Sequence, residues 1–235
     1  MPNTVIIGSG SYLPERIIGG SHFQDAVFFD DNYQKLEKEN SDIIQKFTDI
    51  TEIENRRYID DDLLNSDIAA KAGKAALEDA GIDGESLDYI ISATNFGDID
   101  NHGQQSFMPS LSAMIKNKLG IANPKCVNYD MIFGCPGWVE AMVLADVLIK
   151  SGRAKNILVV GSETLSRVTD PHDRNRMIFA DGAGAVVVTA TDRDHVGIIA
   201  HNTLCFNGEE LNYLENSHTL NPEADQTKKY IRMRG

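Results

Sequence analysis

The stretch YDMIFGCPGW, residues 129–138, decides the fold of this 235-residue chain. A short apolar run ends at two glycines that flank Cys135, and a strongly apolar segment over 138–150 begins at once. This pattern predicts a β-strand over 126–131, a tight turn at 134–137 and a helix over the apolar segment. Because that helix is apolar on most faces, we expect it to be a buried helix.

Cys135 lies where the predicted helix begins, and Pro136 suits the first helical position because its missing N–H needs no partner there. The free N–H groups and the dipole of a helix start favour a thiolate, which is the reactive form of cysteine. The alternative is that Cys135 packs as a small buried hydrophobe, and the local pattern leaves both interpretations open. Cys126 and Cys205 lie in strand-like runs, and we expect both to pack in the core.

Working outward from this turn, the pattern alternates between strand-like and helix-like segments. Ser66 is the predicted N-cap of one helix and Gly81 its end. Gly8-Ser9-Gly10 is expected to form a turn after the first strand. Such alternation predicts an α/β protein with a mainly parallel sheet. The further strands are expected at 4–7, 87–94, 156–160, 185–190 and 197–203, and the further helices at 66–80 and 109–119.

The composition excludes several classes of protein. The net charge is −13 and the isoelectric point about 4.8, which argues against nucleic acid and anionic membranes as partners. Three cysteines without a CxxC pair indicate a reducing compartment, and no signal peptide or membrane-inserted segment is expected, so we predict a cytoplasmic protein. Asp98, Asp100 and His102 are predicted to form a solvated loop, so no metal site is expected. No cofactor is expected either, since Gly8-Ser9-Gly10 lacks the third glycine of a dinucleotide-binding loop.

Five sequence blocks, in order, resemble the β-ketoacyl-acyl-carrier-protein synthase III family of condensing enzymes. The fourth block is the turn around Cys135, and together the blocks extend over nearly the whole chain. They are GSGSYLP at 8–14, TEIENRR at 51–57, AGI at 80–82, the turn at 129–138, and the region 159–188 with GSETLSR, DPHDR and FADGAGAVVV.

The resemblance implies an α/β thiolase-like fold, of which residues 1–235 form the N-terminal domain and the C-terminal half is absent. It implies an acyltransferase in which Cys135 carries an acyl group that is condensed with a malonyl thioester, in fatty-acid or related lipid or polyketide synthesis. Acyl-CoA or acyl-carrier-protein thioesters are then the partners, and Arg174 lies near the CoA adenine. The family also implies a homodimer formed largely by this half.

The chain departs from the family pattern at several places. Glu52 replaces a glycine, and Lys46 and Ile50 stand near the positions of a tryptophan and an arginine that hold CoA. The segments near 22–45 and 95–107 are longer than usual, which suggests a different acyl pocket or partner. The family's catalytic histidine and asparagine belong to the second half, and none of the six histidines of this chain lies in the matching motif.

These departures leave two other hypotheses. One is a catalytically incomplete or truncated interaction subunit of a thiolase-fold protein. The other is a thioester hydrolase, which needs a general base that the sequence does not reveal.

Overall fold

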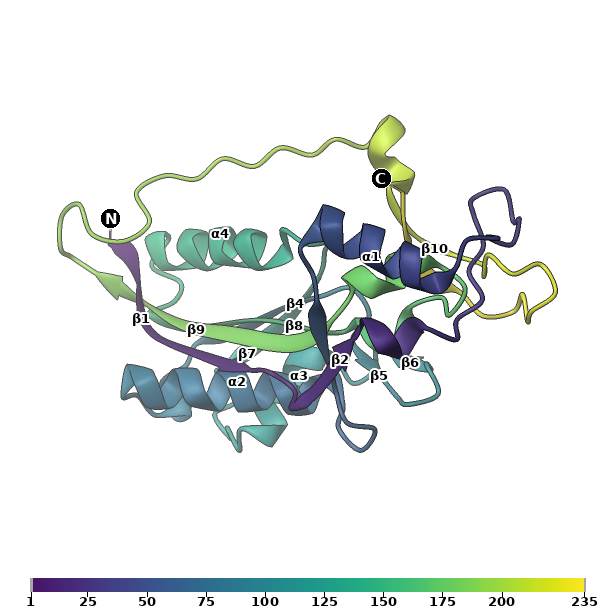
Figure 1. The fold of residues 1–235 in the computed structure, drawn as a ribbon. Helices are drawn as coiled ribbons and strands as arrows, with labels where there is room; N and C mark the ends of the chain where they lie inside the picture. Colours follow the sequence, from purple (N-terminus) through teal and green to yellow (C-terminus); the bar gives the residue numbers. More distant parts are fainter. Residues whose placement is uncertain (1, 235) are drawn as a thin grey trace. The chain divides into compact units, whose positions relative to one another are not determined.

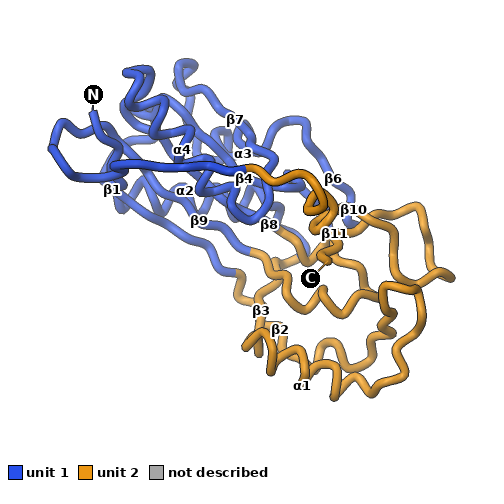
Figure 2. The backbone as a smooth tube through the Cα atoms, turned by 90° about the horizontal axis from the view of Figure 1, so that it is seen from above, with its two compact units in different colours: residues 1–13, 61–163, 182–204 blue, residues 14–60, 164–181, 205–235 orange. Residues whose placement is uncertain are grey.

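The structure is a computed structural model that describes residues 2–234. The chain forms two compact units, coloured separately in Figure 2. Unit 1 comprises residues up to 13, 61–163 and 182–204, and unit 2 comprises 14–60, 164–181 and the residues from 205 on. Each unit is therefore built from three separate stretches of sequence, so long-range contacts hold both together.

Unit 1 is built on a five-stranded sheet with the order β1-β9-β8-β4-β7. The interior strand β4 pairs in parallel with both β7 and β8, whereas β1 pairs antiparallel with β9. The α/β class and the mixed, partly parallel sheet are thus confirmed. The strands are β1 (Asn3–Tyr12), β4 (Tyr89–Thr94), β5 (Asp98–Ile99), β6 (Gln105–Ser106), β7 (Val127–Ile132), β8 (Asn156–Thr164) and β9 (Asp181–Thr191), and the helices are α2 (Asn65–Ala80), η2 (Gly84–Ser86), α3 (Leu111–Lys118) and α4 (Gly137–Lys150).

Helices cover both faces of this sheet, with α4 on one face and α2 and α3 on the other (Figure 1). Alternate residues of β4, namely Tyr89, Ile91 and Ala93, pack in one apolar cluster with the inner side of α4. Every residue of β4 is buried, because neighbours cover both of its faces. This arrangement explains why the strand reads YIISAT, which contains only apolar and small uncharged residues.

The glycines near the N-terminus have a different role from the predicted one. The expected turn at 8–10 is wrong, because β1 continues through these residues with one irregularity in register between Ile6 and Gly8. Helix α2 lies directly against them. A β-carbon at Gly8 would come within 2.4 Å of the Ala80 nitrogen, and one at Gly10 within 2.3 Å of the Ala72 oxygen. The two glycines therefore allow a close approach of strand and helix.

Several predicted boundaries shift in the structure. Helix α2 begins at Asn65, and Leu64 rather than Ser66 is its N-cap, because the carboxylate of Asp67 accepts a hydrogen bond from the Leu64 nitrogen at 2.8 Å. Gly81 ends this helix in the left-handed conformation, as predicted, with φ 63°. The strand predicted at 197–203 does not form, since that segment runs outside the sheet.

Unit 2 contains two small antiparallel sheets and one α-helix. Its apolar core lies between the helix and the first sheet and includes Phe23, Phe28, Ile43 and Met177. Its elements are β2 (Arg16–Gly19), η1 (Gly20–Phe23), α1 (Asn40–Thr51), β3 (Asn55–Tyr58), η3 (Leu165–Val168), η4 (Arg174–Ile178), η5 (Glu209–Asn212), β10 (Leu214–Ser217) and β11 (Tyr230–Met233). In the described part of the chain, residues 2–234, no helix combines the length and apolarity needed to cross a membrane.

The residue that replaces a family glycine sits at a strained position. Glu52 follows α1 in the left-handed region, with φ 58° and ψ 15°. A side chain in this region costs about 1 kcal/mol, whereas glycine adopts it freely. The resemblance identified Glu52 as a departure, and the backbone shows why glycine suits the position.

We expect Glu52→Gly to raise the free energy of unfolding by about 0.5–1 kcal/mol, because it removes the left-handed strain. Glu54→Gly is the matched control, since it removes the same charge from a residue outside the left-handed region. It should lower the free energy of unfolding through chain entropy. Urea denaturation measures both changes, and a change of the same sign for the two variants would contradict the explanation.

Candidate active site

Cys135 lies in a tight turn between the end of β7 and the start of α4. The turn is closed by a hydrogen bond of 2.8 Å from the Gly137 nitrogen to the Gly134 oxygen. The side chain of Cys135 is exposed, so the interpretation of this residue as a buried hydrophobe is wrong. Pro136 occupies the N-cap position rather than the predicted first helical position, with φ −79° and ψ 5°. The turn thus presents a free thiol one residue before the helix cap.

Close packing fixes the start of α4. A β-carbon at Gly137 would lie 3.0 Å from that of Phe133 and 3.3 Å from that of Ala93, so only glycine fits without displacement. On β8, a β-carbon at Gly161 would lie 3.4 Å from the side chain of Trp138. The first turn of α4 is therefore held against the carboxyl ends of β4 and β8, and this contact positions Cys135.

The start of α4 is open to a ligand. No side chain caps it, although the Glu140 nitrogen donates to the Pro136 oxygen at 3.1 Å. The first N–H groups of a helix have no partner within the helix, and they carry the positive end of the helix dipole. Such donors stabilise the oxyanion that develops when a thiolate attacks a thioester carbonyl. An exposed thiol and backbone N–H donors thus come from one short segment.

The three cysteines lie in distinct environments. Cys126 is 1% exposed, and burial raises the pKa of its thiol. Core packing of Cys126 is therefore confirmed. Cys205, by contrast, is exposed in an extended segment, and the prediction that it packs in the core is wrong because the strand expected there does not form. Only Cys135 combines exposure with a helix start.

The helix predicted to be buried is covered on one side within unit 1. Val139 and Val147 are 57% and 50% exposed, whereas Ala141 and Ala145 are fully buried. The exposed side chains of Ile132 and Phe133 extend the apolar surface beside Cys135. This surface lies next to the thiol and can contact an apolar acyl chain.

An extended segment covers part of α4. The buried carboxylate of Asp146 forms an ion pair with Lys150 at 2.8 Å, and its Oδ2 lies 3.4 Å from Nε2 of His201. Lys150 also donates to the Ile198 oxygen at 3.3 Å. These contacts hold residues 198–201 along the helix.

Arg174, the predicted CoA-binding residue, lies in unit 2 at the start of η4 and is exposed. The loop before it is held by carboxylates. Asp170 accepts hydrogen bonds from Leu220 and Thr219 at 2.6 and 2.9 Å, and Asp173 accepts from Asn175 at 2.8 Å. Arg174 therefore projects from a turn that hydrogen bonds hold in place.

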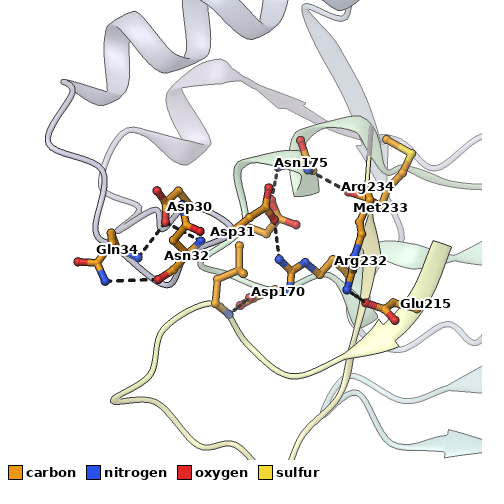
Figure 3. A network of polar contacts seen from close by, with 12 residues as sticks. Asp30, Asp31, Asn32, Gln34, Asp170, Asn175, Glu215, Arg232, Met233 and Arg234 are labelled. Carbon is orange, nitrogen blue, oxygen red and sulfur yellow. Dashed lines mark hydrogen bonds and ion pairs between the residues drawn. The ribbon is translucent and has the colours of Figure 1, made fainter. Parts of the chain in front are cut away.

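The hairpin β10–β11 is tied to the same loop (Figure 3). The Asn175 side chain donates to the Met233 oxygen at 3.3 Å, and Arg232 forms an ion pair with Asp31 at 2.5 Å. Asp31 belongs to the longer segment 22–45. The sequence did not reveal that this segment contacts the hairpin, because the ion pair joins residues about two hundred positions apart.

His172, in the same loop, has structural contacts. Its Nδ1 lies 2.8 Å from the Val27 oxygen, its Nε2 lies 3.4 Å from the Asn221 amide, and its ring meets the edge of Phe29. Among residues 2–234, no group of three or more histidine, cysteine and acidic side chains is arranged to hold a metal ion.

The two segments near 22–45 and 95–107, which the resemblance predicts to be longer than usual, each line a cavity. The cavity in unit 2 has a volume of about 520 Å³, and the cavity in unit 1 about 370 Å³. The first is lined by Gln24, Ala26, Val27, Phe28 and residues 35–40, and the second by Leu64, Asp98, Asp100, Gln104, Gln105, Ser106, Pro109 and Met114. The segments thus shape concave surfaces of their own.

Comparison with known proteins places these features in a family. The family model described as 3-oxoacyl-[acyl-carrier-protein (ACP)] synthase III matches residues 129–205. The β-ketoacyl-[acyl-carrier-protein] synthase III of Ehrlichia canis (strain Jake) is 35% identical over 86% of this chain and 57% of its own length. That of Thiobacillus denitrificans is 38% identical over 83% of this chain and 54% of its own length. The chain spans about half the length of these curated relatives.

Solved structures with the same family description are similar to this chain. The 3-oxoacyl-[acyl-carrier-protein] synthase III of Aquifex aeolicus VF5 superposes with a TM-score of 0.66 at 32% identity, covering 81% of this chain and 55% of its own. The enzyme of the same description from Pseudomonas aeruginosa PAO1 gives a TM-score of 0.75 at 28% identity, covering 98% of this chain and 63% of its own.

Limited alkylation tests the assignment of the nucleophile. With substoichiometric iodoacetamide, we expect Cys135 to be modified first, because it is exposed at an uncapped helix start. Cys205 is the internal control for exposure alone, and Cys126 should react last because it is buried. Mass-spectrometric mapping of the adducts gives the order. Faster labelling of Cys205 would rule out special reactivity at Cys135.

Proposed function

Because the chain belongs to the 3-oxoacyl-[acyl-carrier-protein] synthase III family and has its thiolase-like α/β fold, we propose that the whole protein is an acyltransferase of this type. It would condense an acyl group with a malonyl thioester in fatty-acid or related lipid or polyketide synthesis. The observation that carries this proposal is the exposed Cys135 at the uncapped start of α4. Residues 1–235 would act as its N-terminal domain.

In the first step, the Cys135 thiolate attacks the carbonyl carbon of an acyl thioester. The oxygen of the tetrahedral intermediate carries the negative charge, and N–H groups in the first turn of α4 are suited to stabilise it. The N–H of Gly137 is not among them, since it donates to the Gly134 oxygen. The carbon–sulfur bond to the leaving thiol breaks, and that thiolate takes a proton. The acyl group then remains on Cys135, beside the apolar surface of Ile132, Phe133 and Val139.

In the second step, a malonyl thioester loses carbon dioxide, and its carbanion attacks the acyl carbonyl and releases Cys135 as a thiolate. The family resemblance assigns this step to a histidine and an asparagine without counterparts in residues 1–235. We therefore propose that the chain by itself accepts an acyl group but does not turn over. An interaction subunit remains the alternative, and acylation of Cys135 distinguishes the two.

For the thioester partners, we propose acyl-CoA or acyl-carrier protein, with Arg174 as a contact to CoA. The exposed position of Arg174 on a braced loop supports this role. CoA would bind more weakly than in close relatives, because Ile50, 71% exposed, and Lys46 replace the side chains that hold it. We further propose a cytoplasmic location, which the three free cysteines favour.

We also propose a homodimer formed through the edge strand β7. This strand pairs with β4 on one side, and at the end of the sheet its other side is left open. Val127 and Tyr129 on it are 40% and 45% exposed. An open, apolar edge strand is suited to continue the sheet with a second copy.

Acylation of the chain tests the first step. Incubation with a short-chain acyl-CoA should add one acyl group, located on Cys135 by mass spectrometry. Cys135→Ala should abolish the adduct, and Cys205→Ala should leave it unchanged.

Arg174→Met should raise the acyl-CoA concentration needed to acylate Cys135. A malonyl carrier protein added to the acylated chain should yield no repeated turnover. An acyl group found elsewhere in wild-type protein would favour the interaction subunit.

Light scattering tests the assembly. We expect the mass of a dimer for the wild-type chain, because dimerisation covers the open edge of β7. Tyr129→Lys places a charge on that strand and should shift the protein toward monomer. Lys125→Glu, just before the strand, is the control for a change of surface charge. A monomeric wild-type protein would refute the proposal.

A further inference from the structure

The inner face of the small sheet β2–β3 carries an unusual number of cations. Arg16 lies directly opposite Tyr58, and Ile18 directly opposite Arg56. Opposed residues of an antiparallel pair point to the same face, and neighbours along a strand point to opposite faces. Arg16, Arg56 and Tyr58 therefore share the inner face, whereas Arg57 points to the outer one.

A third arginine reaches the same place from η4. The guanidinium carbons of Arg56 and Arg176 lie 5.2 and 5.5 Å from the centre of the Phe23 ring. The ring of His22 lies 6.1 Å from that of Tyr58. All these residues belong to unit 2. We call them the basic cluster, which comprises Arg16, His22, Arg56, Tyr58 and Arg176.

Positive charge dominates the electrostatics of the cluster. Burial lowers the pKa of Arg176 and that of His22. For His22 the nearby positive charges lower the pKa further, in the order Arg176, Arg16, Arg56. Like charges that crowd together in this way destabilise one another unless an anion lies between them.

The nearby carboxylates are engaged elsewhere. Asp181 accepts hydrogen bonds from Ile59 and Ser166 at distances of 2.6–2.8 Å. Asp170 accepts from the residues 219 and 220. Within residues 2–234, no carboxylate lies within ion-pair distance of Arg16, Arg56 or Arg176.

The cluster also holds hydrogen-bond donors without acceptors. Tyr58 is 5% exposed, and its buried hydroxyl has no hydrogen-bond partner among the described residues. The buried Nε of Arg176 has none either, and its Nη1 makes a single long contact of 3.4 Å to the Pro171 oxygen. Arg56 differs, since its nitrogens donate to the carbonyl oxygens of Ile18, Ile53 and Met177. Buried donors of this kind normally have partners, so an acceptor is missing.

We propose that the basic cluster binds one small oxyanion, a phosphate or sulfate group, with Tyr58 and Arg176 as its buried donors. Arg16 makes no side-chain hydrogen bond or ion pair with a described residue, and its exposed side chain can close over the ion from solvent. Arg56 adds charge without a direct contact. The proposal does not rest on the thioester chemistry proposed for Cys135, because binding of free phosphate tests it directly.

Calorimetric titration with inorganic phosphate, against chloride at equal ionic strength, tests the site. Wild-type protein should bind one phosphate. Tyr58→Phe should weaken binding about tenfold, because it removes one donor to a charged group. Without phosphate the same variant should melt no lower than wild type, since the lost hydroxyl has no partner. Arg176→Met should abolish binding.

Arg57→Met is the matched control, because it removes one positive charge from the outer face of the same sheet and should leave phosphate affinity unchanged. Titration with CoA identifies the source of the oxyanion. A Tyr58→Phe defect toward CoA as well means that the site takes a phosphate group of that ligand, and a defect toward phosphate alone means that it takes the free ion. The proposal is overturned if Tyr58→Phe and Arg176→Met both bind phosphate with wild-type affinity. It is also overturned if Arg174→Met is the one variant that loses phosphate binding.

Discussion

The position of Cys135 depends on the close packing of the first turn of α4 against the ends of β4 and β8. At Gly137 a β-carbon would press against Phe133 and Ala93, and at Gly161 it would be in van der Waals contact with Trp138. Small residues at these points let the helix start so near the sheet that the chain must turn sharply between them. The exposed thiol and the uncapped helix start are consequences of that turn.

Close packing also fixes the helix on the opposite face of the sheet. Gly8 and Gly10 let α2 approach β1 at backbone contact distance. With helices packed on both sides, the interior strand β4 has no exposed residue and tolerates only apolar or small side chains. Rigid packing on both faces is what a site needs when a nucleophile must stay aligned with the donors beside it.

Buried polar contacts add to the apolar core of unit 2. Buried carboxylates tie its loops together, and Asp181 alone joins Ile59 to Ser166. Burial raises the pKa of Asp181 and of Asp173, and hydrogen bonds from neighbouring donors oppose that rise. These carboxylates accept hydrogen bonds from loop residues and form no ion pair with the arginines of the basic cluster. Those arginines therefore have no anionic partner among the described residues. The use of the carboxylates to hold loops thus leaves room for an oxyanion beside the arginines.

The sequence by itself determined the α/β class, the strand–turn–helix around Cys135 and the end of α2 at Gly81, because local periodicity and turn chemistry specify them. It did not determine the packing role of Gly8 and Gly10, or that Cys205 is exposed, since both depend on which segments pack together. The resemblance identified Glu52 as a departure, but only the backbone showed its left-handed conformation. The basic cluster likewise joins residues from three distant segments, and only the tertiary structure brings their charges together, because sequence patterns report neighbours along the chain and not across it.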